Sequence, residues 1–178
     1  MKLTIINGCN SNNLLQKRVL DYLKENKISE IADWINLDNV RHCMGCDYCQ
    51  ITNPGICGIE DGNNEVLRQY MKSDRVIIIT PVQFGCCNSI TKNFIDRTEP
   101  LFLSFQVLKD GKSVMKGRYD KYPDLVVIGV GDDEDTGAAE TFKKFITTCN
   151  LSAVSNKVST KMILHSEDMA GIKELMLW

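Results

Sequence analysis

The 178 residues carry a formal net charge of −2, which excludes a general electrostatic attraction to nucleic acid or to an anionic membrane surface. No apolar run approaches the ~20 residues that a membrane-spanning helix needs, so we expect no membrane partner. Hydrophobic residues make up 43% of the chain, as in ordinary globular proteins, and the length suits a single domain over residues 1–178.

The first strand is predicted over residues 3–7, a short apolar run rich in β-branched side chains. This run is too short for the apolar core of a signal peptide, so we expect a cytoplasmic protein whose eight cysteines stay reduced. Residues 13–26 carry Leu15, Val19 and Leu23 at helical spacing and predict a helix.

A polar loop joins this strand to this helix and contains Gly8, Cys9, Asn10, Ser11 and Asn13. Free backbone N–H groups at the start of a helix, together with the helix dipole, can hold an anion such as a phosphate. A plain N-cap at residue 11, 12 or 13 explains the same composition. Residue types alone leave both interpretations open.

Strands and helices alternate along the rest of the chain. Runs rich in β-branched residues predict strands, and apolar residues at helical spacing predict helices. The expected strands cover residues 28–37, 75–80, 124–130 and 154–164, and the expected helices cover residues 61–71, 90–102 and 138–150. The polar, basic residues 107–122 are expected to form an irregular excursion from the core.

This alternation predicts an α/β, flavodoxin-like, three-layer doubly wound fold with a five-stranded parallel sheet in the order 2-1-3-4-5. Loops at residues 81–89 and from Gly131 onward follow strands directly, and Ser89 is the expected N-cap of the next helix. In open α/β sheets ligands bind outside the carboxyl ends of the strands. We therefore expect residues 8–13 and 81–89 to face one crevice.

Four of the eight cysteines form a compact loop motif, with Cys43, Cys46, Cys49 and Cys57 separated by two, two and seven residues. Thiolates on a turn-rich loop are typical ligands of iron–sulfur clusters and of zinc. Successive two-residue gaps favour iron–sulfur ligation, because zinc sites usually pair two knuckles far apart in sequence. A redox-active thiol loop and the simple burial of small apolar side chains are the alternatives.

The chain resembles the flavodoxin-like family of NADPH-dependent FMN reductases and, within it, the iron–sulfur flavoproteins. The residues that carry the resemblance are the Ile-Ile-Asn-Gly of residues 5–8, the four-cysteine motif with Glu60 and Asp61 beyond it, and the Thr-Pro-Val-x-Phe-Gly of residues 80–85 leading to residues 92–97. The resemblance covers about residues 1–100 and, more loosely, residues 129–131.

The resemblance implies two cofactors and a homodimer or homotetramer. The FMN phosphate is expected in the first loop, the isoalloxazine ring against residues 81–85, and a [4Fe-4S] cluster on the four cysteines. The residues implied to bind FMN are Gly8, Cys9, Asn10, Ser11, Asn13, Pro81, Val82, Gln83, Phe84, Gly85 and Gly131.

Two family side chains that bind phosphate are absent, namely an arginine in the first loop and a threonine at the start of the following helix. One lost charge-assisted hydrogen bond costs about 1.5–3 kcal/mol, so we expect weakened FMN binding. Gln83 replaces a frequent aromatic residue and Cys86 replaces a serine, which alters the hydrogen bonding expected near the ring.

The sequence favours an electron-transfer flavoprotein that passes electrons between FMN and the cluster, with a redox partner such as ferredoxin or NAD(P)H. The protein needs no acid, base or nucleophile, because the cofactors carry the chemistry. One alternative is an NAD(P)H-dependent FMN or quinone reductase without a cluster. The other is a flavin-less binding module that senses metal or redox state.

Overall fold

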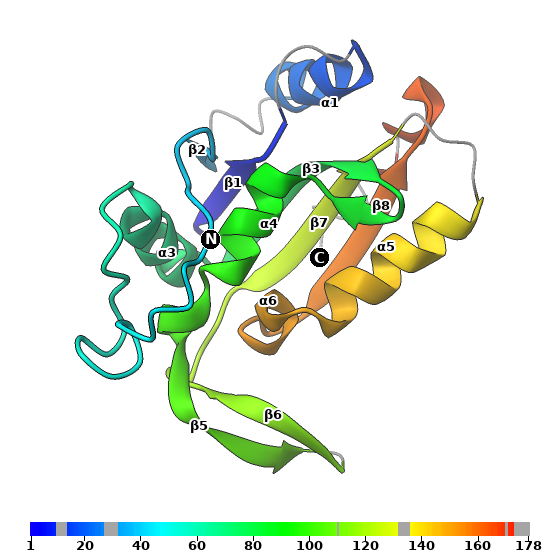
Figure 1. Ribbon diagram of the computed structural model, residues 1–178. Coiled ribbons are helices and arrows are strands. Elements are labelled where there is room, and N and C mark those ends of the chain that lie inside the picture. Colours follow the sequence, from blue (N-terminus) through cyan, green and yellow to red (C-terminus); the bar gives the residue numbers. More distant parts are fainter. Residues whose placement is uncertain (10–13, 27–31, 110, 132–135, 170, 173–178) are drawn as a thin grey trace.

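The computed structural model describes residues 1–9, 14–26, 32–109, 111–131, 136–169 and 171–172. Within these residues, five parallel strands form a sheet in the order β2-β1-β3-β7-β8, and the short β4 pairs antiparallel with the end of β3 (Figure 1). The strands of this sheet are β1 (Leu3–Asn7), β2 (Ala32–Asn36), β3 (Arg75–Gln83), β4 (Cys86–Cys87), β7 (Asp124–Val130) and β8 (Val158–Ile163). The predicted doubly wound order is confirmed, because β7 and β8 are the fourth and fifth parallel strands along the chain.

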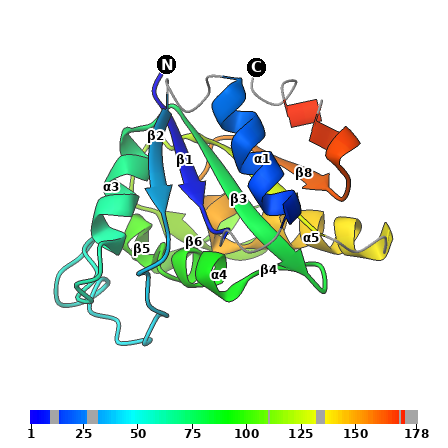
Figure 2. The same ribbon diagram turned by 90° about the horizontal axis from the view of Figure 1, so that it is seen from above.

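Helices lie on both faces of the sheet, with α1 on one side and α3, α4 and α5 on the other (Figure 2). None of the helices in the described residues is long and apolar enough to cross a membrane. The helices are α1 (Leu14–Glu25), α3 (Asn63–Lys72), α4 (Ser89–Asp96), α5 (Thr136–Thr148) and α6 (Asn150–Ala153), with 3-10 turns η1 (Glu99–Leu101) and η2 (Ser166–Met169).

The alternation of side chains along β3 builds the two cores that hold these layers together. Ile78 packs in one core with Phe94 of α4 and Phe142 of α5. Ile77 points to the opposite face and packs in the other core with Val19 of α1. All five side chains are at most 1% exposed, so the central strand is buried on both faces as its sequence predicted.

The predicted helix over residues 90–102 is wrong beyond Asp96, where α4 ends. Pro100 lies inside the predicted segment and cannot continue an α-helix, since it lacks an N–H and clashes with the preceding turn. The chain instead forms the short turn η1 around Pro100 and enters a strand at Phe102.

The predicted irregular excursion over residues 107–122 is also wrong, because most of it belongs to a regular hairpin. β5 (Phe102–Lys109) pairs antiparallel with β6 (Lys112–Gly117), and the hairpin stands away from the sheet (Figure 1). The Asp-Gly dipeptide at residues 110–111 is a strong sequence signal for such a hairpin, and Gly111 has the positive φ, 74°, that glycine favours.

The predicted loop over residues 81–89 is shorter than expected. β3 continues through Gln83, the chain turns at Phe84 and Gly85 with φ of 52° and 72°, and β4 returns along β3. Asn88 caps α4 in place of the expected Ser89, since the Asn88 side chain accepts a hydrogen bond from the backbone N–H of Thr91 at 3.0 Å.

Replacing Gly85 by alanine tests the packing of this turn on α5. A Cβ at Gly85 would lie 2.6 Å from Cβ and from Cγ2 of Thr141, whereas a Cβ at Gly111 would meet nothing within 4 Å, although φ is nearly the same at 72° and 74°. We expect Gly111→Ala to lose about 1–2 kcal/mol from the backbone conformation alone. Gly85→Ala should lose clearly more free energy of unfolding in urea titrations, and equal losses would contradict the tight contact.

Candidate functional site

The carboxyl ends of three neighbouring strands meet at one edge of the sheet. Gly8 follows β1, and its N–H donates to the carbonyl oxygen of Ile79 in β3 at 2.8 Å. Pro81 of β3 pairs with Val130 at the end of β7, and Gly131 follows directly. The structure thus brings Gly8 and residues 81–85 to the same edge, as the sequence predicted, and Gly131 lies at this edge as well.

The start of the first loop packs against α4. A Cβ at Gly8 would lie 2.1 Å from Thr91 Oγ1, so the close approach admits only glycine. The Asn88 side chain donates to the Gly8 carbonyl oxygen at 2.8 Å, which fixes the loop to the cap of α4. Thr91 Oγ1 is buried and has no hydrogen-bond partner in the described part of the chain. An unpaired hydroxyl beside the first loop fits an anionic group such as the FMN phosphate.

The rest of the predicted phosphate loop is described only in part. Cys9 is buried, its pKa is raised to about 12 by that burial, and its N–H donates to Asn7 Oδ1 at 3.1 Å. Asn10, Ser11 and Asn13 lie outside the described residues. The Cys9 side chain packs in the same core as Val19 and Ile77.

The predicted ring-binding residues divide into two kinds. Pro81, Val82 and Gly85 are buried, whereas Gln83 is exposed and Phe84 is 99% exposed at the tip of the β3–β4 turn. Of these five residues, only Gln83 and Phe84 have exposed side chains. The buried residues hold the turn in place.

The cysteine loop, residues 41–60, connects β2 to α3 and contains neither helix nor strand. It lies beside α3 in both views (Figures 1 and 2). Cys43 and Cys46 are exposed, whereas Cys49 and Cys57 are half-buried. The side chain of Gln50 donates to the carbonyl oxygen of Glu99 at 2.7 Å and ties the loop to η1.

Two tight turns and the side chain of Asn64 determine the path of the backbone in this loop. Gly45 and Asp47 have positive φ, 63° and 54°, and turn the chain between the first three cysteines. Cys57 is held by Asn64 of α3 on both sides of its backbone. Its N–H donates to Asn64 Oδ1 at 2.9 Å, and its carbonyl oxygen accepts from Asn64 Nδ2 at 2.8 Å.

The thiols of the loop interact electrostatically. The pKa of the Cys49 thiol is raised to about 11, first by burial and then by the nearby charges of Cys57, Glu99 and Cys43. Within the described residues, no three His, Cys, Asp or Glu side chains are arranged to hold a metal ion. The donor types fit a thiolate-bound cluster, and in such loops the gathering of the ligands is coupled to metal binding.

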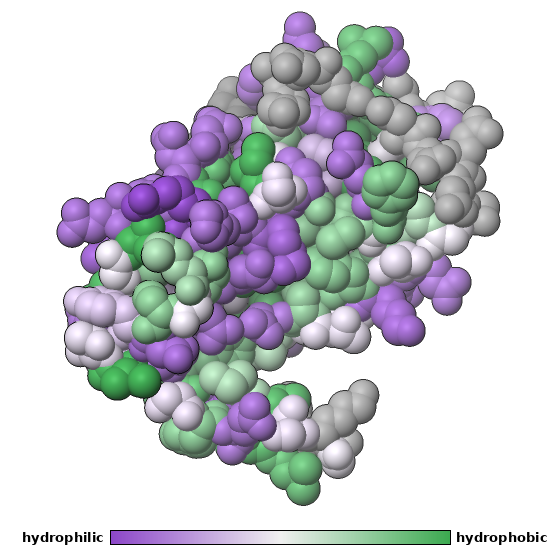
Figure 3. Space-filling view, in the orientation of Figure 1, coloured by the Kyte–Doolittle hydropathy of each residue, from purple (hydrophilic) through white to green (hydrophobic). Residues whose placement is uncertain are grey.

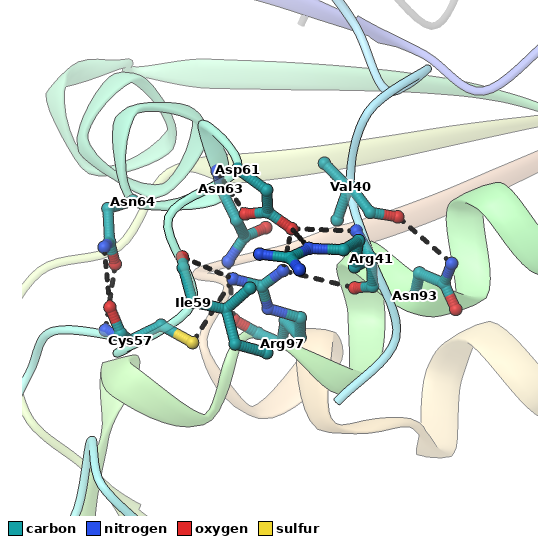
Figure 4. Close-up of polar contacts among 9 residues, drawn as sticks. All are labelled: Val40, Arg41, Cys57, Ile59, Asp61, Asn63, Asn64, Asn93 and Arg97. Atoms are coloured by element: carbon teal, nitrogen blue, oxygen red, sulfur yellow. Dashed lines mark hydrogen bonds and ion pairs between the residues drawn. The ribbon is translucent and has the colours of Figure 1, made fainter. Parts of the chain in front are cut away.

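Arg97 connects the two ends of the cysteine loop from the end of α4 (Figure 4). Its guanidinium is 1% exposed and forms an ion pair with Asp61, which is 5% exposed. Nη1 also donates to the Arg41 carbonyl oxygen at 3.2 Å. Nη2 donates to Cys57 Sγ at 3.2 Å and to the Ile59 carbonyl oxygen at 3.3 Å. One buried side chain thus contacts the loop where it begins, where it ends and at its fourth thiol.

The charges of this pair are held in place by hydrogen bonds. Burial acts to raise the pKa of Asp61, but hydrogen bonds from Arg97 and from the backbone N–H groups of Arg41 and Asn63 outweigh it and hold the pKa below its ordinary value. Burial acts to lower the pKa of Arg97, but its bonds to Asp61 and Cys57 raise it. Both groups are therefore charged at neutral pH.

The sequence does not predict that Asp61 and Arg97 act together at the cysteine loop. Both residues belong to motifs that carry the family resemblance, but nothing in their spacing of 36 residues indicates a pair. The available signal is Arg97 itself, which follows the apolar residues Phe94 and Ile95 of a helix. Arginine is seldom fully buried unless it is paired, so this position predicts a buried partner.

Comparison with known proteins identifies relatives of the chain. The sequence model of the family described as NADPH-dependent FMN reductase matches residues 1–159. An iron–sulfur flavoprotein of Archaeoglobus fulgidus is 36% identical over 103 residues, which cover 55% of this chain and 49% of that protein. An iron–sulfur flavoprotein of Methanocaldococcus jannaschii is 31% identical over 96 residues, covering 53% and 48%. The matches span about half the length of these two relatives.

Solved structures of low sequence identity share the fold. An NAD(P)H:quinone oxidoreductase from Methanothermobacter marburgensis has a TM-score of 0.64 at 17% identity, covering 99% of this chain and 92% of that one. An FMN-dependent NADH-azoreductase from Bacillus anthracis, solved in complex with FMN, has a TM-score of 0.65 at 16% identity, covering 98% and 97%.

Asp61→Asn tests the buried pair through its pH dependence. The variant leaves the Arg97 charge buried without its carboxylate, and we expect a loss of about 3–5 kcal/mol at neutral pH. Because folding lowers the pKa of Asp61, its contribution is fully present above the pKa of the unfolded state and is lost as the pH falls through the lower folded pKa.

The difference in unfolding free energy between wild type and Asp61→Asn should therefore shrink below about pH 4. Asp33→Asn is the control, because Asp33 forms an exposed pair with Lys2 at 3.4 Å and such pairs contribute about 0–1 kcal/mol. Chemical denaturation at pH 7 and near pH 3 measures both. A difference for Asp61 that does not change with pH would contradict the assignment.

Proposed function

The chain belongs to the NADPH-dependent FMN reductase family, and from this premise we propose that it is a flavin-dependent oxidoreductase that passes electrons between FMN and a [4Fe-4S] cluster. The cluster would be held by Cys43, Cys46, Cys49 and Cys57. The observation that carries this proposal is the donor set of the cysteine loop, in which a buried guanidinium already donates to the fourth thiol.

The residues at the carboxyl edge of the sheet would bind FMN, which supplies two-electron and one-electron redox chemistry when bound. Gly8 lets the first loop pack directly against Thr91 of α4, whose hydroxyl is unpaired in the described residues and would be available to the phosphate site. Asn10, Ser11 and Asn13 would supply further donors. The exposed side chains of Gln83 and Phe84 would contact the ring.

The cysteine loop would bind the cluster, which supplies a one-electron carrier when bound. Asn64 fixes the backbone of Cys57, and the turns at Gly45 and Asp47 orient the first three thiols relative to one another. The similarity of about half the chain to two proteins named iron–sulfur flavoproteins supports this assignment.

A second candidate function is an NAD(P)H-dependent FMN or quinone reductase without a cluster. It is supported by the match of residues 1–159 to the model of the NADPH-dependent FMN reductase family. In this case the cysteine loop would be structural, and only the flavin edge of the sheet would take part in the chemistry.

The electron donor or acceptor is proposed to be NAD(P)H or a ferredoxin, and a cytoplasmic location would keep the thiols reduced. Assembly into a homodimer or homotetramer is supported by the β5–β6 hairpin. Phe105 and Leu108 of this hairpin are 54% and 80% exposed, and Figure 3 shows the hairpin projecting from the body with hydrophobic surface on it. An isolated two-stranded hairpin is only marginally stable in water, so contact with a second copy would stabilise it.

Cys46→Ser tests the cluster on protein purified and reconstituted without oxygen. Cys46 is exposed, so the variant should keep its circular dichroism spectrum and its bound FMN while losing iron and acid-labile sulfide. Cys149→Ser is the control. Cys149 lies outside the loop and donates to the Ile146 carbonyl oxygen at 3.3 Å, a bond that serine can replace.

Wild type and Cys149→Ser should both carry iron and sulfide in the ratio of one [4Fe-4S] cluster per chain. Equal iron and sulfide in Cys46→Ser would exclude that residue as a ligand. Wild-type protein that oxidises NAD(P)H with FMN but holds no iron or sulfide would favour the second candidate function.

A further inference from the structure

The hydrogen bond from Arg97 to Cys57 Sγ is not needed to hold the backbone of Cys57 in place. The backbone of Cys57 is already fixed by Asn64 through hydrogen bonds of 2.9 and 2.8 Å. The bond of 3.2 Å from Arg97 Nη2 to Cys57 Sγ is an additional contact that reaches the sulfur itself (Figure 4). Its consequence is therefore electrostatic as well as structural.

The two arms of the guanidinium have separate partners. Nη1 faces Asp61 and the Arg41 carbonyl oxygen, while Nη2 faces Cys57 Sγ and the Ile59 carbonyl oxygen. The Asp61 carboxylate therefore contacts the guanidinium through Nη1, on the side away from Cys57 Sγ. The sulfur faces the positively charged Nη2.

Burial strengthens the electrostatic effect of Arg97 on the sulfur of Cys57. Arg97 is 1% exposed, so water screens its charge poorly, and its Nε is buried without a hydrogen-bond partner in the described residues. Reduction of an iron–sulfur cluster adds negative charge, and hydrogen bonds and positive charge at the sulfurs stabilise the reduced form. A donor of this kind raises the reduction potential of the centre that it contacts.

We propose that Arg97 is a positioning residue that donates a hydrogen bond to the ligand sulfur of Cys57 and raises the reduction potential of the cluster. Asp61 holds the Arg97 guanidinium in place. This inference rests on the cluster assignment made under the proposed function. It concerns the properties of the centre and is separate from the question of whether the centre binds.

The test uses the double variant Asp61→Asn/Arg97→Gln, which removes both charges together and so leaves no unpaired charge in the interior. Glu65→Gln/Arg68→Gln is the matched control, since this Glu–Arg pair of α3 joins at 2.8 Å but is exposed. Arg97→Lys keeps the positive charge but has a single ammonium group, which cannot contact Asp61 and Cys57 Sγ with two separate nitrogens. Each protein is reconstituted without oxygen, and the midpoint potentials of cluster and FMN are measured by dye equilibration with EPR detection of the reduced cluster.

The double variant should shift the midpoint potential of the cluster to more negative values and leave that of FMN unchanged. Arg97→Lys should shift it in the same direction by less, and the control should shift neither potential. A cluster potential equal to wild type in the double variant would overturn the inference. If the double variant does not hold a cluster, an unchanged potential in Arg97→Lys would overturn it.

The proposed function is tested first, by measuring iron and sulfide in the reconstituted wild-type protein. Wild-type protein that binds no iron and sulfide on reconstitution would overturn both the cluster assignment and the role of Arg97. Wild-type protein that binds the cluster, with potentials that no variant shifts, would overturn only the role of Arg97.

Discussion

The buried ion pair between Arg97 and Asp61 is the interaction on which the cysteine loop depends. It joins the end of α4 to the start of α3, and the same guanidinium holds the carbonyl oxygens of Arg41 and Ile59. Taking two charges out of water is costly, and a buried pair often adds little net stability. The pair instead contributes specificity, because Nη1 and Nη2 of Arg97 reach the Arg41 and Ile59 carbonyl oxygens only when both ends of the loop lie in one arrangement.

Helix α4 links this junction to the carboxyl edge of the sheet. At its N-cap, Asn88 donates to the Gly8 carbonyl oxygen, and at its C-cap, Arg97 donates to Cys57 Sγ. Eight residues of α-helix span roughly 12 Å, so the two candidate cofactor regions are fixed to the ends of one short rigid element. Phe94 and Ile95, on the buried face of that helix, anchor it to the sheet.

The strand order could be predicted from the alternation of strands and helices together with the family resemblance. The β-branched run of residues 75–80 indicated a central parallel strand that is buried on both faces. The β5–β6 hairpin was missed because the helical spacing of residues 90–102 was extended across Pro100, and the Asp-Gly turn signal was not used. Cysteine spacing indicated the donor set. It could not indicate the Asp61–Arg97 pair, since this contact between residues far apart in sequence arises only where the tertiary fold brings the C-cap of α4 beside the start of α3, and not from any local pattern.

The assignment of two cofactors is tested most directly by the visible absorption spectrum of protein purified without oxygen, recorded before and after dithionite. We expect the two bands of a bound flavin on a broad thiolate-to-iron shoulder, with both bleached on reduction. A flavin spectrum without the shoulder would contradict the cluster. A colourless protein would contradict both cofactors and leave the cysteine loop as a thiol or zinc site.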